Sequence, residues 1–267
     1  MSRATPQPAF VLHQWDWSET SLILDLFTRG QGRVAAVAKG AKRPYSQLRP
    51  VLLPFQRLQV ALGRPRADEG SDILTLRSAD YAGAGAVLPP ARLMSGFYLN
   101  ELLLKLLARN DPHEQLFDAY ADALQALAVG DDDESPLRAF ELLLLRETGV
   151  LPELDRATLS QSRVQADGRY QLRPEAGLVA APDGGDEPGL SGAQCEALQA
   201  ALDGGDAAAL RLATRPALAA LKLQLRALLH YHLGAPALRT RQLMLDVRRL
   251  LDAPARPVAP GPNPRPP

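Results

Sequence analysis

Apolar residues occur in short runs over the first third of the chain. Five such runs, separated by Gly, Pro and Ser, read AFVLHQW, SLILDLF, GRVAAVAKG, LLPFQRLQVALG and DILTLRSADY between residues 9 and 81. Short β-type runs with turn signals between them are typical of a small barrel or sandwich. Gly30 and Gly32 separate the second run from the third, where glycine takes a positive φ at little cost. The pattern predicts a five-stranded barrel within residues 1–82.

The periodicity becomes helical after Pro90 and stays helical over most of residues 83–252. Segment 91–109 is apolar over most of its circumference, and Glu101, Lys105 and Arg109 form its only polar strip. We therefore expect this helix to be the buried centre of a bundle. The fold class that follows is α+β, with a barrel domain and then a mostly helical domain.

Other segments refine this division of the chain. Helices are predicted over residues 112–130, 135–149, 191–202 and 215–234. The second of them begins with Ser135 and Pro136 and ends at Gly149, as capped helices do. Residues 153–192 are rich in Gly, Pro and Asp, with short β-like pieces in GRYQLRP and GLVAA, so they predict an irregular insert. The last segment, 253–267, holds seven prolines and predicts a disordered tail.

Charge is neutral overall but uneven along the chain. Lys plus Arg number 30, and Asp plus Glu also number 30. Segment 26–67 nevertheless holds nine basic residues and no acidic one. Such a segment can be a solvated strand edge, or it can bind a polyanion, because cations neutralise phosphates and release condensed counterions. Aromatic side chains interleaved with the cations would stack on bases. Tyr45 is available for this, whereas the position of Phe55 favours the core.

Signals for catalysis are few. The chain has no GxSxG, HExxH, GxxxxGK[ST] or GxGxxG motif, and its four histidines lack metal-ligand partners. Consecutive acids at Asp131 to Glu134 could serve a metal-dependent nuclease or phosphoesterase, although an exposed loop is the simpler interpretation. The single Cys195 excludes an intrachain disulfide and fits a reducing interior, and no signal peptide or membrane span is predicted. We expect a cytoplasmic protein with no cofactor and no metal.

The order of these features resembles the RecO family of DNA repair and recombination mediators. WSETSLILDLFTRGQGRVAAVAKGAKRPYSQLRPVLLPFQRLQV followed by LTLRSAD is similar to the amino-terminal signature of that family. GFYLNELLLKLL and LRAFELLLLRETG resemble its helical domain, and LGAPALRTRQL resembles its closing segment. The resemblance covers roughly residues 9 to 250 and implies an amino-terminal OB-fold.

What the resemblance implies is a bacterial, nucleoid-associated DNA-binding mediator without enzymatic activity. Members bind single- and double-stranded DNA, anneal complementary strands, engage the acidic carboxy-terminal tail of single-strand-binding protein, and work with RecR to help a recombinase load. We expect a monomer. The cations that match the family's basic strand and loop, and that we expect to contact DNA, are Arg33, Lys39, Lys42, Arg43, Arg49 and Arg57.

Two further expectations come from the same resemblance. Many relatives hold zinc with four cysteines in the region that corresponds to residues 153–181, and this chain has no cysteine there. Ordinary packing must then replace the metal. The protein-tail partner needs an apolar groove beside a cation, and Arg138 matches that position. The alternative is that Arg138 only pairs with Glu134 or Glu141.

Overall fold

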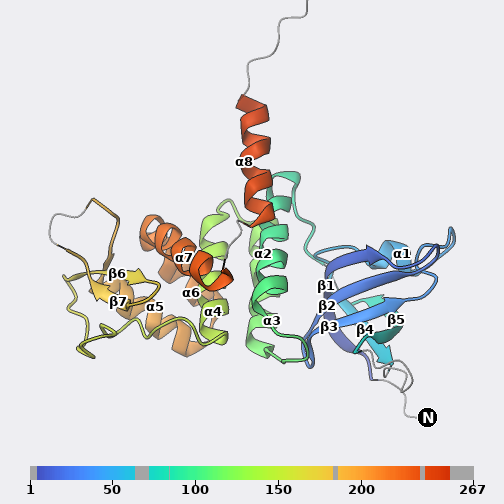
Figure 1. Cartoon of the computed structure of the whole chain (residues 1–267), viewed down its shortest axis with the longest axis horizontal. Helices are drawn as coiled ribbons and strands as arrows, with labels where there is room; N and C mark the ends of the chain where they lie inside the picture. The colour runs from blue at the N-terminus through green and yellow to red at the C-terminus, as the bar shows by residue number, and fades with distance from the viewer. Residues whose placement is uncertain (1–4, 64–71, 84, 183–185, 235–237, 253–267) are drawn as a thin grey trace, which may run out of the picture.

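The computed structural model describes residues 5–63, 72–83, 85–182, 186–234 and 238–252. The predicted proline-rich tail and the cations Arg64 and Arg66 lie outside these residues. The described chain consists of a β-barrel and a larger helical part, with a small sheet at the far side of the helices (Figure 1). The predicted fold class is confirmed.

The barrel is closed and has the strand order β1-β2-β3-β5-β4. Its strands are β1 (Gln7–Asp16), β2 (Leu22–Thr28), β3 (Gly32–Ala38), β4 (Leu58–Gly63) and β5 (Leu74–Tyr81), with the short helix α1 (Leu48–Val51) between β3 and β4. All pairs are antiparallel except β3 with β5, which closes the barrel. The five-stranded barrel that the sequence pattern predicts is present, and it is OB-like, as the family resemblance implies.

Alternation along the strands gives the barrel two apolar faces. Leu24 and Leu26 of β2 point into the barrel and join Val34 and Val60 in its core. Phe27 points outward and packs against Phe117 of the helical part at a ring-centroid distance of 5.4 Å. Because β2 is buried on both faces from Leu24 onward, SLILDLF has little polar alternation, and its one charged residue, Asp25, is buried and paired with Arg33.

The helical part begins with η1 (Pro90–Arg92) and α2 (Leu93–Leu106). Its other helices are α3 (Glu114–Val129), α4 (Glu134–Glu147), α5 (Gly192–Gly204), α6 (Ala207–Thr214), η2 (Arg215–Ala217), α7 (Leu218–Leu233) and α8 (Arg239–Asp252). The central helix is α4, in which every residue from Ser135 to Leu145 is buried. The expectation that α2 is the centre was wrong, because α2 lies between the barrel and the other helices (Figure 1). Glu101 and Lys105 of the predicted polar strip form an ion pair at 3.3 Å.

Residues 153–192 form a loop-rich segment that carries a three-stranded sheet. Its strands are β6 (Arg169–Arg173), β7 (Gly177–Ala180) and β8 (Leu190–Ser191), in the order β7-β6-β8. The two predicted β-like pieces are therefore strands. Leu154, Val164 and Leu178 are buried and belong to the same apolar cluster as the helices. These contacts hold the segment in the region where relatives are expected to bind zinc.

The helix α8 begins beside α2 and extends away from the body (Figure 1). Its first turn is held by Glu101 of α2. The Glu101 carboxylate accepts hydrogen bonds from the backbone N–H groups of Arg239 at 2.8 Å and Thr240 at 2.9 Å, and from the Thr240 hydroxyl at 2.6 Å. A carboxylate at this position satisfies the free N–H groups of the helix start and complements its dipole. Within the described residues, no helix is long and apolar enough to cross a membrane.

Candidate nucleic-acid interface and partner pocket

The connection between β3 and β4, residues 39–57, crosses one end of the barrel. Five of the six cations predicted to contact DNA lie in this connection: Lys39, Lys42, Arg43, Arg49 and Arg57. The backbone N–H of Lys42 donates to the Thr20 carbonyl in the β1–β2 turn at 3.0 Å. The Tyr81 hydroxyl, at the end of β5, donates to the Pro50 carbonyl. The connection therefore contacts the β1–β2 turn (residues 17–21) through Lys42 and Tyr81 through Pro50, and we call this end the basic end of the barrel.

Four cations of the basic end are free to bind an anion. Lys39, Arg43, Arg49 and Arg57 are exposed, and none of them forms an ion pair with a residue that the structure describes. Gly40 has a φ of +71°, a backbone conformation that favours glycine. The Arg43 side chain packs over Gly40 and lies 3.5 Å from the position that a Cβ atom would take there. The connection thus presents positive charge without local compensation.

Lys42 differs from these four cations because its ammonium group is engaged. Its Nζ lies 3.1 Å from the Asp16 carboxylate and donates to the Ser18 carbonyl at 3.2 Å. Both partners belong to the end of β1 or the turn that follows it. Lys42 therefore ties the β1–β2 turn to the connection, in addition to contributing charge there.

Arg33 lies away from the basic end, at the junction of the barrel with α2. Its guanidinium donates to both carboxylate oxygens of buried Asp25, at 2.9 and 3.0 Å. Nη1 also donates to the Leu104 and Leu107 carbonyls, the second at 3.1 Å, at the end of α2. This set of contacts gives Arg33 a structural role, and the structure does not bring it together with the other five cations.

The lack of acids in segment 26–67 is compensated in part by distant residues. Arg29 pairs with Glu114 at 2.5 Å and with Asp118 at 3.0 Å, both on α3. Together with the Arg33–Asp25 and Lys42–Asp16 pairs, this engages three of the seven described cations in the segment. Among the described residues of this segment, the free charge is therefore confined to the basic end.

A separate pocket of about 150 Å³ surrounds Arg138. Its other lining residues come from α2, α7 and the start of α8 and are Tyr98, Lys222, Arg226, Leu229, His230, Leu233, Leu238 and Arg241. The lining combines three leucines with four cations and contains no carboxylate. An apolar pocket rimmed by cations has the chemistry expected for an acidic segment that ends in apolar residues.

Arg138 has a second set of contacts beneath this pocket. Its Nη1 lies 2.9 Å from Oε2 of buried Glu141, and the Tyr98 hydroxyl donates to Oε1 of Glu141 at 2.5 Å. Burial raises the pKa of Glu141, although Arg138 and Tyr98 partly oppose the shift. Nε of Arg138 is buried and has no hydrogen-bond partner among the described residues. Arg138 thus both pairs with Glu141 and lines the pocket, so the two sequence interpretations are compatible.

Lys222 and Arg226 were not predicted as site residues. Both lie on α7, one turn apart, and His230 follows after another turn, so the three side chains reach the pocket from one face of the helix. Their i, i+4, i+8 spacing is visible in the sequence. What the sequence does not show is that Tyr98 and Arg138 lie opposite this face.

The acidic loop before α4 is used for local structure. The Asp132 carboxylate accepts from the backbone N–H of Glu134 at 2.8 Å and from Ser135, while Asp133 pairs with Arg92 at 2.7 Å. Glu134 pairs with Lys222. Among the residues that the structure describes, no group of three or more His, Cys, Asp or Glu side chains could hold a metal ion. These acids diverge rather than converge on one point.

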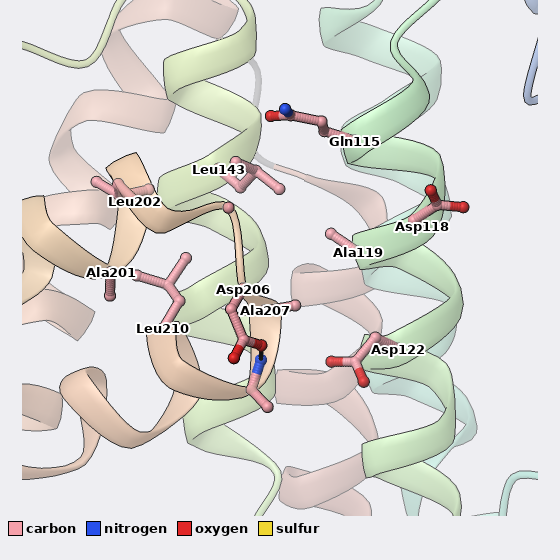
Figure 2. Close-up of a pocket in the computed structure, with 12 residues that line it drawn as sticks. Gln115, Asp118, Ala119, Asp122, Leu143, Ala201, Leu202, Asp206, Ala207 and Leu210 are labelled. Carbon is pink, nitrogen blue, oxygen red and sulfur yellow. Dashed lines mark hydrogen bonds between the residues drawn. The ribbon is translucent and has the colours of Figure 1, made fainter.

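A second cavity, of about 310 Å³, lies between α3 and the α5–α6 hairpin (Figure 2). Its charged lining residues are all acidic, namely Asp118, Asp122 and Asp206, and Gln115 is also polar. Each carboxylate already has a partner: Asp118 binds Arg29, Asp122 binds Arg211, and Asp206 accepts from the Ala208 N–H at 2.8 Å. An acidic cavity repels phosphate, so we assign it no part in nucleic-acid binding.

An OB-like barrel with a basic end, followed by a helical domain, is typical of proteins that bind nucleic acid. Family models agree with this class. Residues 1–81 match "Recombination protein O N terminal" and residues 90–242 match "Recombination protein O C terminal". The chain belongs to the RecO family of DNA repair proteins.

Individual relatives are similar over nearly their whole length. "DNA repair protein RecO" of Verminephrobacter eiseniae is 54% identical over 254 residues, which covers 93% of this chain and 98% of the relative. The protein of the same name from Variovorax paradoxus is 53% identical over 261 residues, with the same coverage. That of Delftia acidovorans is 50% identical over 255 residues.

Proposed function

We propose that this RecO-family protein binds single- and double-stranded DNA through the basic end of the barrel and anneals complementary strands. The observation that carries the proposal is the group of four exposed cations, Lys39, Arg43, Arg49 and Arg57, that lack ion-pair partners among the described residues. Their preorganised connection at one end of an OB-like barrel is a suitable surface for a phosphate backbone. Arg33 is left out of this surface because its guanidinium is engaged with Asp25.

Annealing needs no catalytic group. Two single strands repel each other through their phosphates, and a cationic surface that holds both lowers this repulsion and raises their effective concentration. We therefore propose a mediator without enzymatic activity. The alternative, a metal-dependent nuclease that uses Asp131 to Glu134, is disfavoured because Asp132, Asp133 and Glu134 point to separate partners.

The pocket around Arg138 supports a second part of the proposal. The acidic carboxy-terminal tail of single-strand-binding protein would place its apolar end against Leu229, Leu233 and Leu238 and its carboxylates against Arg226 and neighbouring cations. Docking there would bring the basic end of the barrel to DNA that single-strand-binding protein covers. Help in loading a recombinase, together with RecR, completes the proposed role, and the family resemblance supports this part of the proposal.

A strand-annealing assay tests the proposed function. Complementary labelled strands are mixed with the protein, with and without single-strand-binding protein bound to them. We expect faster annealing than without the protein in both cases. A variant with Lys39, Arg43, Arg49 and Arg57 changed to alanine should lose annealing of bare strands, whereas an Arg226→Glu variant should lose only annealing of covered strands. Failure of the unchanged protein to anneal bare strands would contradict the proposal.

A further inference from the structure

Aromatic side chains gather at the basic end of the barrel. Six Trp, Tyr or Phe side chains of the described residues are large and exposed, and four of them lie at this end: Trp15, Trp17, Tyr45 and Tyr81. Tyr45 is 94% exposed and Trp17 is 62% exposed. Single exposed apolar side chains are normal, but a group of aromatic rings beside free cations is typical of a binding surface.

Four separate elements bring these rings to the same end of the barrel. Trp15 lies near the end of β1, Trp17 lies in the β1–β2 turn, and Tyr81 ends β5. Tyr45 belongs to the β3–β4 connection, between the free cations Arg43 and Arg49. Of these four rings only Tyr45 lies within the basic segment 26–67, so the contribution of the two tryptophans becomes visible only in the closed barrel.

The face on which Trp15 lies is set by the strand register. Trp15 pairs with Ile23 of β2, and Ile23 pairs with Val37 of β3, so the three side chains share the outer face of the barrel. Residues that share the inner face, such as Leu24, belong to the barrel core. The His13 ring contacts Trp15 edge to face at a centroid distance of 4.5 Å, which orients the indole on this outer face.

The β1–β2 turn that carries Trp17 is fixed relative to the free cations. Its Ser21 carbonyl accepts from the Trp17 N–H at 3.1 Å, and its Thr20 carbonyl accepts from the Lys42 N–H at 3.0 Å. The Lys42 ammonium adds the contacts with Asp16 and Ser18. A turn held at several points loses less conformational freedom when a ligand binds.

We infer that Trp15, Trp17, Tyr45 and Tyr81 form a stacking surface for the unpaired bases of a single nucleic-acid strand. The inference rests on the proposed DNA binding and adds its specificity: the free cations bind phosphates of either form of DNA, and the rings bind bases that only a single strand exposes. In a duplex the base faces are stacked on one another and are not accessible to the rings. Stacking does not depend on the identity of the base, which suits a protein that must act at any sequence.

The chain contains two tryptophans, and both belong to this surface, so tryptophan emission reports on it directly. The protein is titrated with an oligothymidylate of about 15 nucleotides and with a duplex of the same length, a length within the site size of such barrels. We expect strong quenching by the single strand and little quenching by the duplex at equal saturation, measured by anisotropy of the labelled DNA. Equal quenching by the two forms would overturn the inference.

Alanine variants of Trp17 and Tyr45 complete the test, because side chains this exposed can be removed with little effect on folding. Each should weaken single-strand binding about 5-fold or more, with duplex binding changed less than about 2-fold. Tyr231→Ala is the matched control, since Tyr231 is 50% exposed but lies on α7.

The outcomes separate this inference from the proposed function. If both alanine variants keep single-strand affinity while alanine at Lys39 and Arg43 lowers it, the stacking surface is refuted and DNA binding at the basic end stands. If the unchanged protein binds neither form of DNA, both the inference and the proposed function are refuted. Equal loss of single-strand and duplex binding in the alanine variants would also refute stacking.

Discussion

Arg33 and Asp25 form a two-pronged ion pair at the junction of the barrel and the helices, with N–O distances of 2.9 and 3.0 Å. Asp25 is fully buried, and Arg109 adds a weaker contact at 3.5 Å. The remaining Arg33 nitrogen donates to carbonyls at the end of α2, where a helix leaves acceptors without partners. The pair therefore connects two strands of the barrel to the helical part.

Removal of Arg33 should affect stability rather than DNA binding. In Arg33→Ala, the Asp25 carboxylate stays buried with only Arg109 nearby, and breaking such a pair costs about 3 kcal/mol of unfolding free energy. Chemical denaturation measures this loss. DNA affinity of the folded variant should change less than about 2-fold. A variant of unchanged stability that binds DNA much more weakly would instead assign Arg33 to the DNA surface.

The cap that Glu101 provides should make α8 sensitive to pH. Burial acts to raise the pKa of Glu101, but hydrogen bonds from Thr240 and Arg239 outweigh it and lower the pKa below its ordinary value. A carboxyl with a lowered folded pKa stabilises the docked helix above its unfolded pKa, and this contribution is lost as pH falls through the folded pKa. We expect α8 to detach in this acidic range.

Hydrogen exchange of the α8 backbone amides, corrected for the intrinsic pH dependence, measures this detachment. Glu101→Gln should exchange fast already at neutral pH and should lose most of the pH dependence. Lys105→Ala is the control, because Lys105 pairs with Glu101 at 3.3 Å and forms no hydrogen bond or ion pair with the described residues of α8. Protection of α8 that is equal in the unchanged protein and in Glu101→Gln would contradict the role of the cap.

The cationic pocket should bind acidic peptides with an apolar end. Arg226 is exposed and lines the pocket, so Arg226→Glu replaces attraction with repulsion and should raise the Kd of such a peptide about 10-fold or more. Isothermal titration with a synthetic peptide measures the change. Arg163→Glu, an exposed change away from the pocket, should leave the Kd unaltered. If both variants lose affinity equally, the binding reflects overall charge and not the pocket.

Several elements of the fold follow from local signals in the sequence. The five β-type runs became the five strands of the barrel. Gly149 has a φ of +73° and ends the predicted α4 helix. Phe55, which the sequence favours as a core residue, is buried and packs against Phe97 at 5.0 Å. Each of these features depends on a turn residue or an apolar pattern within a few positions.

Features that join distant residues could not be predicted in this way. Arg29 and Asp118 are 89 positions apart in the chain, and Glu101 and Thr240 are 139 apart. A segment that lacks acids therefore contained three cations with acidic partners elsewhere. The helix α6 was also missed, although Asp206 accepts from the Ala208 N–H as a cap does. An Asp that directly follows Gly204 and Gly205, the glycines at the end of α5, is a helix-start signal that is visible in the sequence.

The salt dependence of DNA binding tests the central claim most directly. The Kd for a single strand is measured at several salt concentrations for the unchanged protein and for a variant with alanine at Lys39, Arg43, Arg49 and Arg57. Each lost phosphate contact lowers the slope of log K against log salt by about 0.7. We expect weaker binding and a slope smaller by up to about 3.

A control variant removes the same number of charges elsewhere. It carries alanine at four exposed arginines of residues 153–192, namely Arg156, Arg163, Arg169 and Arg173. This control should keep the affinity and slope of the unchanged protein. If the basic-end variant retains the same Kd and the same slope at every salt concentration, the assignment of DNA binding to the basic end of the barrel is contradicted.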